Sequence, residues 1–177
     1  RLGAALIREQ YDEIPYLADV YAGRTDLALK SELFFLDSSA SQLRKADLED
    51  GTRYVSDYVF DKALIYASGW LKGEDLVRYL KHYETVLEAV AAPVLVIYLY
   101  DSLENCLERI RRRNRPYEQE IEISFLQHLA GGYETLYTDY PVCPVLRLRP
   151  DQCRSREQVD QIARQVSWYL AKTNACR

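Results

Sequence analysis

The sequence predicts an α/β fold in which a parallel sheet is flanked by helices. Short segments rich in strand-forming residues alternate with longer segments that carry an apolar residue at every third or fourth position. One short segment, 93–99, is apolar throughout, which is typical of a strand buried on both faces of a parallel sheet. No repeat, linker or low-complexity stretch divides the 177 residues, so we expect one domain, 1–177, around a single core.

Composition argues against several classes of protein. The net charge is −4, whereas general nucleic-acid binders are usually basic. No apolar run is long enough to cross a membrane, and the start does not resemble a signal peptide. The four cysteines lack CxxC spacing and only two histidines are present, so we expect reduced intracellular thiols rather than a zinc site. Neither nucleic acid nor a membrane is an expected partner.

Four segments have strand character, and two of them end in a carboxylate. The predicted strands are 4–9, 52–58, 93–100 and 143–148. Glu9 stands at the end of the first strand and Asp57 at the end of the second. Because the carboxyl ends of strands form the ligand crevice of an open α/β sheet, both residues are candidates for a functional site.

Six segments are predicted to be helical, and two of them begin with a capping box. The helices are expected at 26–46, from 57 to 70, at 73–92, from 101 to 113, at 122–139 and from 155 onward. The capping boxes start at Asp101, expected as the N-cap, and at Ser155. Gly131 and Gly132 lie inside one helix, at a cost of about 1 kcal/mol each relative to alanine, and the pattern offers no reason for them.

A run of arginines organises the candidate site. Five arginines fall within residues 109–115 of a chain that is acidic overall. Arg109 and Arg113 are spaced i, i+4 on one face of a helix that Pro116 ends, and Arg115 lies just past that end. We expect these three to converge on phosphate, because guanidinium groups form bidentate, charge-assisted hydrogen bonds with phosphate oxygens. The other two arginines are expected to be solvated surface.

The arginine run resembles the lid of the deoxyribonucleoside kinase family, which includes deoxycytidine, deoxyguanosine and bacterial deoxyadenosine kinases. The pattern Arg-x-x-x-Arg-x-Arg-x-x-Glu-Gln, from Arg109 to Gln119, is close to the family's R-x-x-x-R-G-R-x-x-E-Q-G-I. Asn114 stands where the family usually has glycine, and Glu120 stands where it has the second glycine. The resemblance extends over most of the chain, so it implies a P-loop kinase-like sheet with an arginine-rich lid.

The resemblance also implies roles for residues at the edge of the sheet. The pattern Glu-x-x-x-x-x-Pro-x-Leu-x-x-x-Tyr, from Glu9 to Tyr21, is similar to the bacterial members of the family. In that family the glutamate takes the proton from the sugar 5′-hydroxyl and the tyrosine contacts the 3′-hydroxyl. Asp57 matches an acid that serves near the magnesium ion, but Tyr58 stands where the family has an arginine near the reacting phosphate. The three lid arginines would spread the charge of the transition state.

Further positions are implied to contact the nucleoside. Glu32 stands where the family has a glutamine that reads the base edge, and Ser39 where it has an arginine. A carboxylate only accepts hydrogen bonds, so Glu32 would favour a base with amino or N–H donors, although a solvent-facing helix residue is an equal interpretation. Tyr66 falls where an aromatic often stacks on the base, and a core tyrosine is an equally good account. Glu118 matches the lid glutamate that pairs with Tyr21 around the 3′-hydroxyl.

The implied activity is phosphorylation of the 5′-hydroxyl of a deoxyribonucleoside, with ATP and Mg²⁺ as cofactors. The resemblance implies a cytoplasmic salvage enzyme that forms a homodimer. Two alternatives stay open. A nucleoside monophosphate kinase of thymidylate type would need a cation near Asp57 to hold the acceptor phosphate, and Tyr58 counts against it. A non-catalytic nucleotide-binding or dimerisation module would need no such group.

One part of the family pattern is expected to lie outside these residues. The sequence contains no G-x-x-x-x-G-K-[ST] loop and no methionine. In the family, the first of five strands lies in the middle of the sheet and leads directly into that loop. We therefore expect an N-terminal extension of about thirty residues, a strand, turn and helix, that supplies both. Without it, the sheet would keep two unpaired strand edges inside the core.

Overall fold

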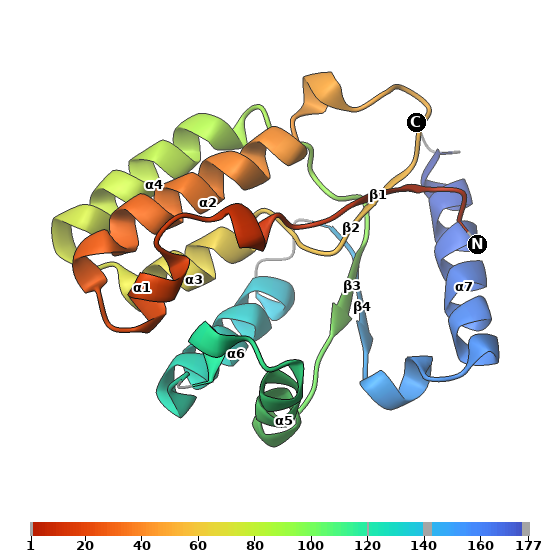
Figure 1. Cartoon of the computed structure of the whole chain (residues 1–177). Helices are drawn as coiled ribbons and strands as arrows, with labels where there is room; N and C mark the ends of the chain where they lie inside the picture. Colours follow the sequence, from red (N-terminus) through yellow and green to blue (C-terminus); the bar gives the residue numbers. More distant parts are fainter. Residues whose placement is uncertain (1, 120, 140–142, 175–177) are drawn as a thin grey trace.

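The computed structural model of the chain describes residues 2–119, 121–139 and 143–174. Strands and helices alternate along the described residues, which confirms the α/β class (Figure 1). The strands are β1 (Ala5–Ile7), β2 (Tyr54–Ser56), β3 (Val96–Leu99) and β4 (Val145–Leu148). The helices are α1 (Leu17–Tyr21), α2 (Ala28–Gln42), α3 (Lys62–Trp70), α4 (Gly73–Leu87), α5 (Leu103–Arg113), α6 (Ile123–Thr138) and α7 (Arg156–Asn174).

The four strands form two parallel pairs. β1 pairs with β2, with Ala5 opposite Tyr54, and β3 pairs with β4, with Val96 opposite Val145. Within the described residues, no ladder joins one pair to the other. All four predicted strands are confirmed as parallel, although each is shorter than its predicted segment.

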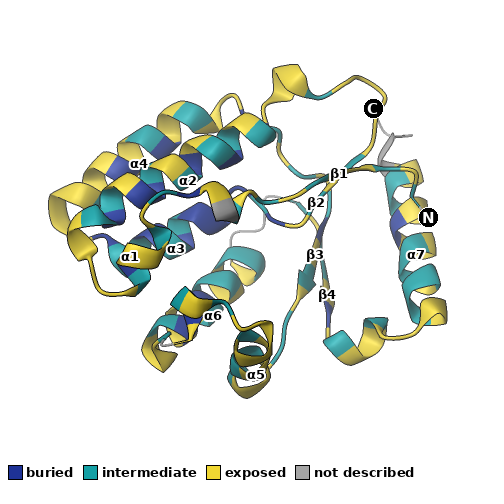
Figure 2. Cartoon of the chain, in the orientation of Figure 1, coloured by how far each residue is buried: buried dark blue, intermediate teal, exposed yellow. Residues whose placement is uncertain are grey.

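Two clusters of apolar side chains hold the helices together. The larger cluster joins α2, α3 and α4, and Leu36 and Tyr79 in it have no exposed surface. The smaller cluster packs Ile65 of α3 against Leu126 and Leu129 of α6. In Figure 2, the buried residues of α2, α3 and α4 turn toward one another, whereas α7 stands apart on the other side of the strands. Helices α2, α3 and α4 therefore pack together as one unit beside the carboxyl ends of β1 and β2.

Helix α3 begins at Lys62, so the predicted start at Asp57 and Tyr58 was wrong. Tyr58 and Phe60 are both buried in the main cluster. The backbone N–H of Tyr58 donates to the Ser56 hydroxyl oxygen at 3.3 Å, so this segment forms a turn before the helix. Burial of the two rings determines the path of the chain here, and helical periodicity begins only after them.

Helix α5 is capped by Ser102, so the predicted N-cap at Asp101 was wrong by one residue. The Ser102 hydroxyl accepts a hydrogen bond from the Asn105 backbone N–H at 3.3 Å. Asp101 accepts instead from the Asn105 side-chain amide, at 2.7 Å, and from Arg109. These hydrogen bonds, with that from the Ser102 backbone N–H, lower the pKa of Asp101 to about 2.

The capping box at the start of α7 is confirmed. The Gln158 backbone N–H donates to the Ser155 hydroxyl at 3.1 Å, and the Ser155 N–H donates to the Gln158 side-chain oxygen at 2.9 Å. This reciprocal pair satisfies two backbone donors that would otherwise lack partners at the helix start.

The glycine pair in α6 has a structural explanation at one of its two positions. A Cβ atom on Gly132 would lie 2.3 Å from Cγ2 of Ile65, so glycine is needed for α6 to contact α3 closely. Gly131 faces open space, and nothing in the structure explains it.

Candidate functional site

A cavity of about 170 Å³ lies at the carboxyl ends of β1 and β2. Its walls come from the segment after β1, from α1, α2 and α3, and from the arginine segment with its short helical turn η4 (Pro116–Glu118). Seven of the nine residues predicted from the sequence line it, and these are Glu9, Tyr21, Glu32, Tyr66, Arg113, Arg115 and Glu118. The fold therefore gathers side chains that lie more than a hundred positions apart in the chain.

Glu9 forms an ion pair with Lys62 on the wall of the cavity. The Glu9 backbone N–H also donates to Oδ1 of Asp57 at 2.9 Å, which ties together the ends of β1 and β2. Both carboxylates thus lie at the predicted edge of the sheet. Asp57 is exposed beside the cavity rather than in its lining.

Lys62 is a site residue that the sequence reasoning missed. Lys62 is the first residue of α3, and it is only 9% exposed. Its Nζ lies 5.0 to 5.7 Å from the centroids of three aromatic rings, those of Phe35, Tyr58 and Tyr66. A cation at a helix N-terminus is disfavoured by the helix dipole, so the Glu9 carboxylate and the ring faces compensate it. The available signal was that Lys62 is the only basic residue between Arg53 and Lys72.

Glu32 is 6% exposed and lines the cavity, so the interpretation of it as a solvent-facing residue was wrong. Burial raises the pKa of this carboxyl to about 7, and the nearby positive charge of Lys62 acts in the opposite direction. Within the described part of the chain, no hydrogen-bond donor reaches the carboxylate. A buried acceptor of this kind is costly unless a bound group satisfies it.

Aromatic rings line one side of the cavity. The Tyr21 ring lies 5.5 Å from that of Trp70 and 5.7 Å from that of Tyr117. Tyr66 contacts Phe125 edge to face at 6.2 Å. Burial raises the pKa of Tyr21 well above its ordinary value and that of Tyr66 to about 12, so both hydroxyls stay neutral at physiological pH. A flat ring system and a neutral hydroxyl donor are thus available to a ligand.

Arg113 and Arg115 reach the cavity and share one carboxylate. Nη2 of Arg113 lies 2.5 Å from Oε2 of Glu118, and Nη1 of Arg115 lies 3.1 Å from Oε1 of the same residue. Asn114 between them adopts the left-handed conformation, with φ 57° and ψ 40°. Glycine and asparagine accept that conformation most readily, which explains how asparagine serves at this position.

Arg109 lies outside the cavity lining, so the predicted convergence of three arginines was wrong for this one. Its Nη1 donates to Oδ2 of Asp101 at 2.5 Å, and its Nη2 lies 3.3 Å from Sγ of Cys106. Asp101 lies at the start of the same helix and holds the guanidinium there. Arg111 and Arg112 are exposed, as expected.

Position 39 does not face the cavity. Ser39 is 3% exposed in the main cluster, and its carbonyl oxygen lies 3.5 Å from the Tyr58 hydroxyl, which donates to Oε1 of Gln42 at 2.7 Å. The expectation that this position faces the base was therefore wrong. Glu120, the other departure from the family pattern in the lid, lies outside the described residues.

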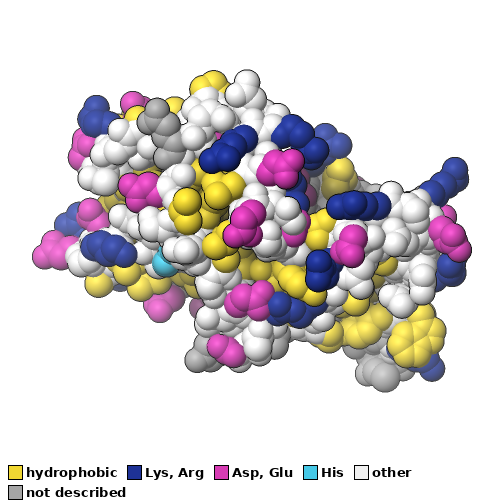
Figure 3. Space-filling view, turned by 90° about the horizontal axis from the view of Figure 1, so that it is seen from below, with side chains coloured by type: hydrophobic (Ala, Val, Ile, Leu, Met, Phe, Trp, Pro, Cys, Tyr) yellow, Lys and Arg dark blue, Asp and Glu magenta, His cyan; other side chains and the backbone are white. Residues whose placement is uncertain are grey.

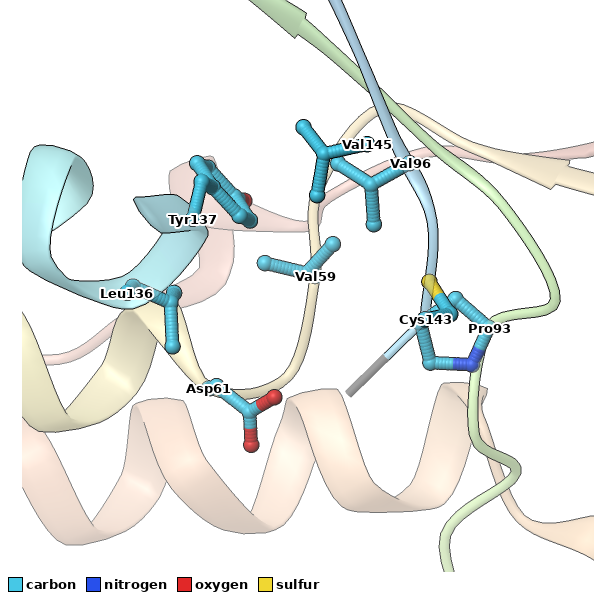
Figure 4. Close-up of a pocket in the computed structure, with 8 residues that line it drawn as sticks. All are labelled: Val59, Asp61, Pro93, Val96, Leu136, Tyr137, Cys143 and Val145. Carbon is cyan, nitrogen blue, oxygen red and sulfur yellow. The ribbon is translucent and has the colours of Figure 1, made fainter. Parts of the chain in front are cut away.

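A smaller cavity of about 10 Å³ is lined by the first residues of β3 and β4, by the end of α6 and by the segment before α3. Figure 4 shows its lining side chains. Its volume is about that of one water probe. Its one carboxylate, Asp61, accepts a hydrogen bond from the Tyr83 hydroxyl at 2.5 Å. Apolar side chains fill most of the remaining wall, including Val59, Val96 and Val145. This cavity is a packing gap and not a ligand site.

The surface near the lid mixes the two signs of charge. Figure 3 views the molecule from the side of α5 and α6, and acidic and basic side chains are interspersed over that face.

Within the described residues, no group of three or more His, Cys, Asp or Glu side chains could hold a metal ion. In the same residues, no helix is long and apolar enough to span a membrane. Asp57 is exposed, and a single carboxylate suits Mg²⁺ that is also held by phosphate oxygens and water.

Comparison with known sequences gives a consistent family. The profile of the family "Deoxynucleoside kinase" matches residues 2–170. The chain is 32% identical over 137 residues to deoxyguanosine kinase of Bacillus subtilis, covering 76% of this chain and 66% of that protein. It is 29% identical over 154 residues to deoxyadenosine kinase of Dictyostelium discoideum, covering 83% of this chain and 62% of that protein. The chain thus spans slightly less than two thirds of the length of these relatives.

Solved structures show the same fold. Deoxyadenosine kinase from M. mycoides with bound dCTP superposes with a TM-score of 0.78 and 22% identity, over 94% of this chain and 87% of that chain. The same enzyme with dCMP and a flexible dCDP bound gives a TM-score of 0.79 and 21% identity, with the same coverage. The fold, the parallel strands and the match over nearly the whole sequence agree: the chain belongs to the deoxynucleoside kinase family.

Proposed function

We propose that the protein transfers a phosphoryl group from ATP to the 5′-hydroxyl of a deoxyribonucleoside. The observation that carries the proposal is that one cavity brings together a carboxylate at the sheet edge, two arginines and a tyrosine beside a buried glutamate. Phosphoryl transfer needs these groups: a base near the hydroxyl, cations around the phosphate and anchors for the sugar. Relatives named as deoxyguanosine and deoxyadenosine kinases support it.

In this proposal Glu9 is the general base. It lies two residues past β1, and the ion pair with Lys62 holds its carboxylate toward the cavity. A bound nucleoside would lie against Tyr66, with its sugar hydroxyls near Glu9, Tyr21 and Glu118. Glu9 would accept the proton of the 5′-hydroxyl as its oxygen attacks the γ-phosphorus of ATP, and the bond from that phosphorus to the bridging oxygen would break to release ADP.

Arg113 and Arg115 would bind the transferring phosphate. Their planar guanidinium groups suit phosphate oxygens, and both are already held at the cavity by Glu118. Arg109 would join them only by exchanging its hydrogen bond to Asp101 for one to phosphate. A magnesium ion, with Asp57 as its carboxylate ligand, would neutralise phosphate charge when bound.

The ATP phosphates need a binding loop, and we propose that it lies on a strand between β2 and β3. Within the described residues each of these two strands is hydrogen-bonded to only one neighbour. Unpaired strand edges leave backbone donors and acceptors without partners, so one further parallel strand would complete the sheet. A crystal structure of the complete gene product should show that strand and its glycine-rich loop. Direct pairing of β2 with β3 would contradict this.

The nucleoside monophosphate kinase alternative gains one observation. Lys62 supplies a cation at the cavity, and the backbone N–H of its partner Glu9 donates to Asp57, beside which an acceptor phosphate would need a cation. However, Lys62 is already paired with Glu9, and that carboxylate would repel a second phosphate. We therefore prefer an uncharged nucleoside as the acceptor.

We also propose that the protein is a homodimer and that it is located in the cytoplasm. Three apolar residues of one face of α4, Val77, Leu80 and Leu87, are exposed, and a homodimer would cover them.

Free Cys106, Cys143 and Cys153 are compatible with a reducing, cytoplasmic location.

The experiment that tests the proposal is steady-state ATP turnover by the protein made from its complete gene. Deoxynucleosides should stimulate turnover, and deoxynucleoside monophosphates should not. Stimulation by monophosphates alone would establish the alternative kinase, and binding without turnover would establish a non-catalytic module.

A further inference from the structure

The cavity wall contains a buried acceptor that no donor of the described residues satisfies. Glu32 is buried, lines the cavity and has no hydrogen bond within the described residues. Phe35, Tyr66 and Trp70 line the same cavity and offer flat apolar faces to a base. Because Ser39 is packed in the core, it adds no base-reading group. A base that donates hydrogen bonds to Glu32 would therefore satisfy this buried acceptor.

The two oxygens of an ionised carboxylate best match two adjacent donors. Guanine presents N1–H beside its 2-amino group, and both can be bound by one carboxylate. Adenine and cytosine each place an amino donor next to a ring nitrogen acceptor, which would face the second oxygen and repel it. Thymine places its single N–H between two carbonyl acceptors. A carboxylate at this position thus discriminates against three of the four bases.

Resting on the function proposed above, we propose that Glu32 makes this cavity a deoxyguanosine site, in which its carboxylate accepts hydrogen bonds from guanine N1–H and the 2-amino group. The positive charge of Lys62 acts on the Glu32 carboxylate from nearby. Lys62 does not take up the hydrogen-bonding capacity of Glu32, because its own ion-pair partner is Glu9. Burial supplies the low dielectric in which such charge-assisted hydrogen bonds are strong.

The charged and titratable groups around Glu32 make the recognition depend on pH. They are Lys62 and Tyr66 on α3, Tyr21 on α1, Tyr79 on α4, Glu9 after β1, and Glu118, Arg113 and Arg115 in the lid. With a pKa of about 7, Glu32 takes up a proton as the pH falls below neutral. The carboxylic acid then offers one donor and one acceptor, which matches adenine and cytosine instead. Preference for guanine should therefore increase as the pH rises.

The test is calorimetric binding of three nucleosides to the protein from its complete gene. Deoxyinosine differs from deoxyguanosine only by lacking the 2-amino group. At pH 8.5 deoxyguanosine should bind about 10- to 100-fold more tightly than deoxyinosine, the range expected for one lost hydrogen bond to a buried charge. The ratio of deoxyguanosine affinity to deoxyadenosine affinity should decrease when the pH is lowered from 8.5 to 6.

A matched pair of variants locates the effect. Glu32→Gln keeps the size of the side chain but replaces one acceptor oxygen with a donor, so it should remove both the deoxyguanosine preference and its pH dependence. Glu74→Gln removes the same charge from an exposed position at the start of α4 and should change neither.

Each result decides the proposal. Equal binding of deoxyinosine and deoxyguanosine by the unmodified protein would overturn it without any variant, and so would a guanine preference that survives Glu32→Gln. In both cases the kinase proposal would stand, since a deoxynucleoside still binds. Absence of binding by every deoxynucleoside would overturn both proposals together.

Discussion

Glu9, Lys62 and Glu32 line one cavity, and the lysine interacts with both carboxylates. Glu9 is ion-paired with Lys62, whereas Glu32 is buried and has no hydrogen bond within the described residues. The sequence indicated both carboxylates through their spacing to Pro15 and Tyr21. It did not indicate Lys62, because a single lysine at a helix start has no periodic signature.

Substitution of Glu9 by glutamine should remove most turnover but leave nucleoside binding largely intact. The amide keeps the shape of the side chain but cannot take the proton, and general base catalysis is worth about 10²- to 10⁴-fold. Kinetics and calorimetry on the same preparation would check both halves. Glu13→Gln, at an exposed position four residues later, is the control. A near-normal kcat in Glu9→Gln would show that Glu9 is not the base.

Replacement of Arg113 by lysine should lower kcat even though the charge is kept. Lysine lacks the planar fork that can contact two phosphate oxygens, and it would also contact Glu118 less completely. We expect a loss of about tenfold or more, on the scale of one charge-assisted hydrogen bond. Arg112→Lys changes an exposed neighbour in the same way and should be neutral. Equal kcat values in the two variants would make Arg113 an ordinary surface residue.

The elements were easier to predict than their ends. Parallel strands and amphipathic helices follow from periodicity, and all of them are present. The start of α3 was missed because the burial of Tyr58 and Phe60 is a tertiary effect that no local pattern contains. Arg109 was misplaced for a related reason, since the competing partner Asp101 lies eight residues away in the sequence.

The contact between α3 and α6 predicts opposite effects at two adjacent glycines. Gly132→Ala places a Cβ atom against Ile65 and should lower the free energy of unfolding by about 1–3 kcal/mol, the usual cost of overpacking. Gly131→Ala meets open space and should raise it by up to about 1 kcal/mol through helix propensity. Urea unfolding of both variants would measure the difference. Equal effects would mean that the two helices do not contact each other at Gly132.

The whole molecule shows two parallel strand pairs with a cavity of about 170 Å³ at the carboxyl end of one of them. Lid and sheet edge meet at that cavity although they are far apart in the sequence. The family pattern predicted this meeting, because it assigned Glu9, Tyr21 and Glu118 to one substrate. What it could not supply is the choice of base, since this chain departs from the family at the cavity-lining position 32.

The most direct measurement of the central claim is the transfer of labelled γ-phosphate from ATP to deoxyguanosine by the protein from its complete gene, with the product identified by NMR. We predict labelled deoxyguanosine 5′-monophosphate, formed in a magnesium-dependent reaction that Glu9→Gln nearly abolishes. Absence of labelled monophosphate with every deoxynucleoside, or label attached at the 3′-oxygen, would contradict the account.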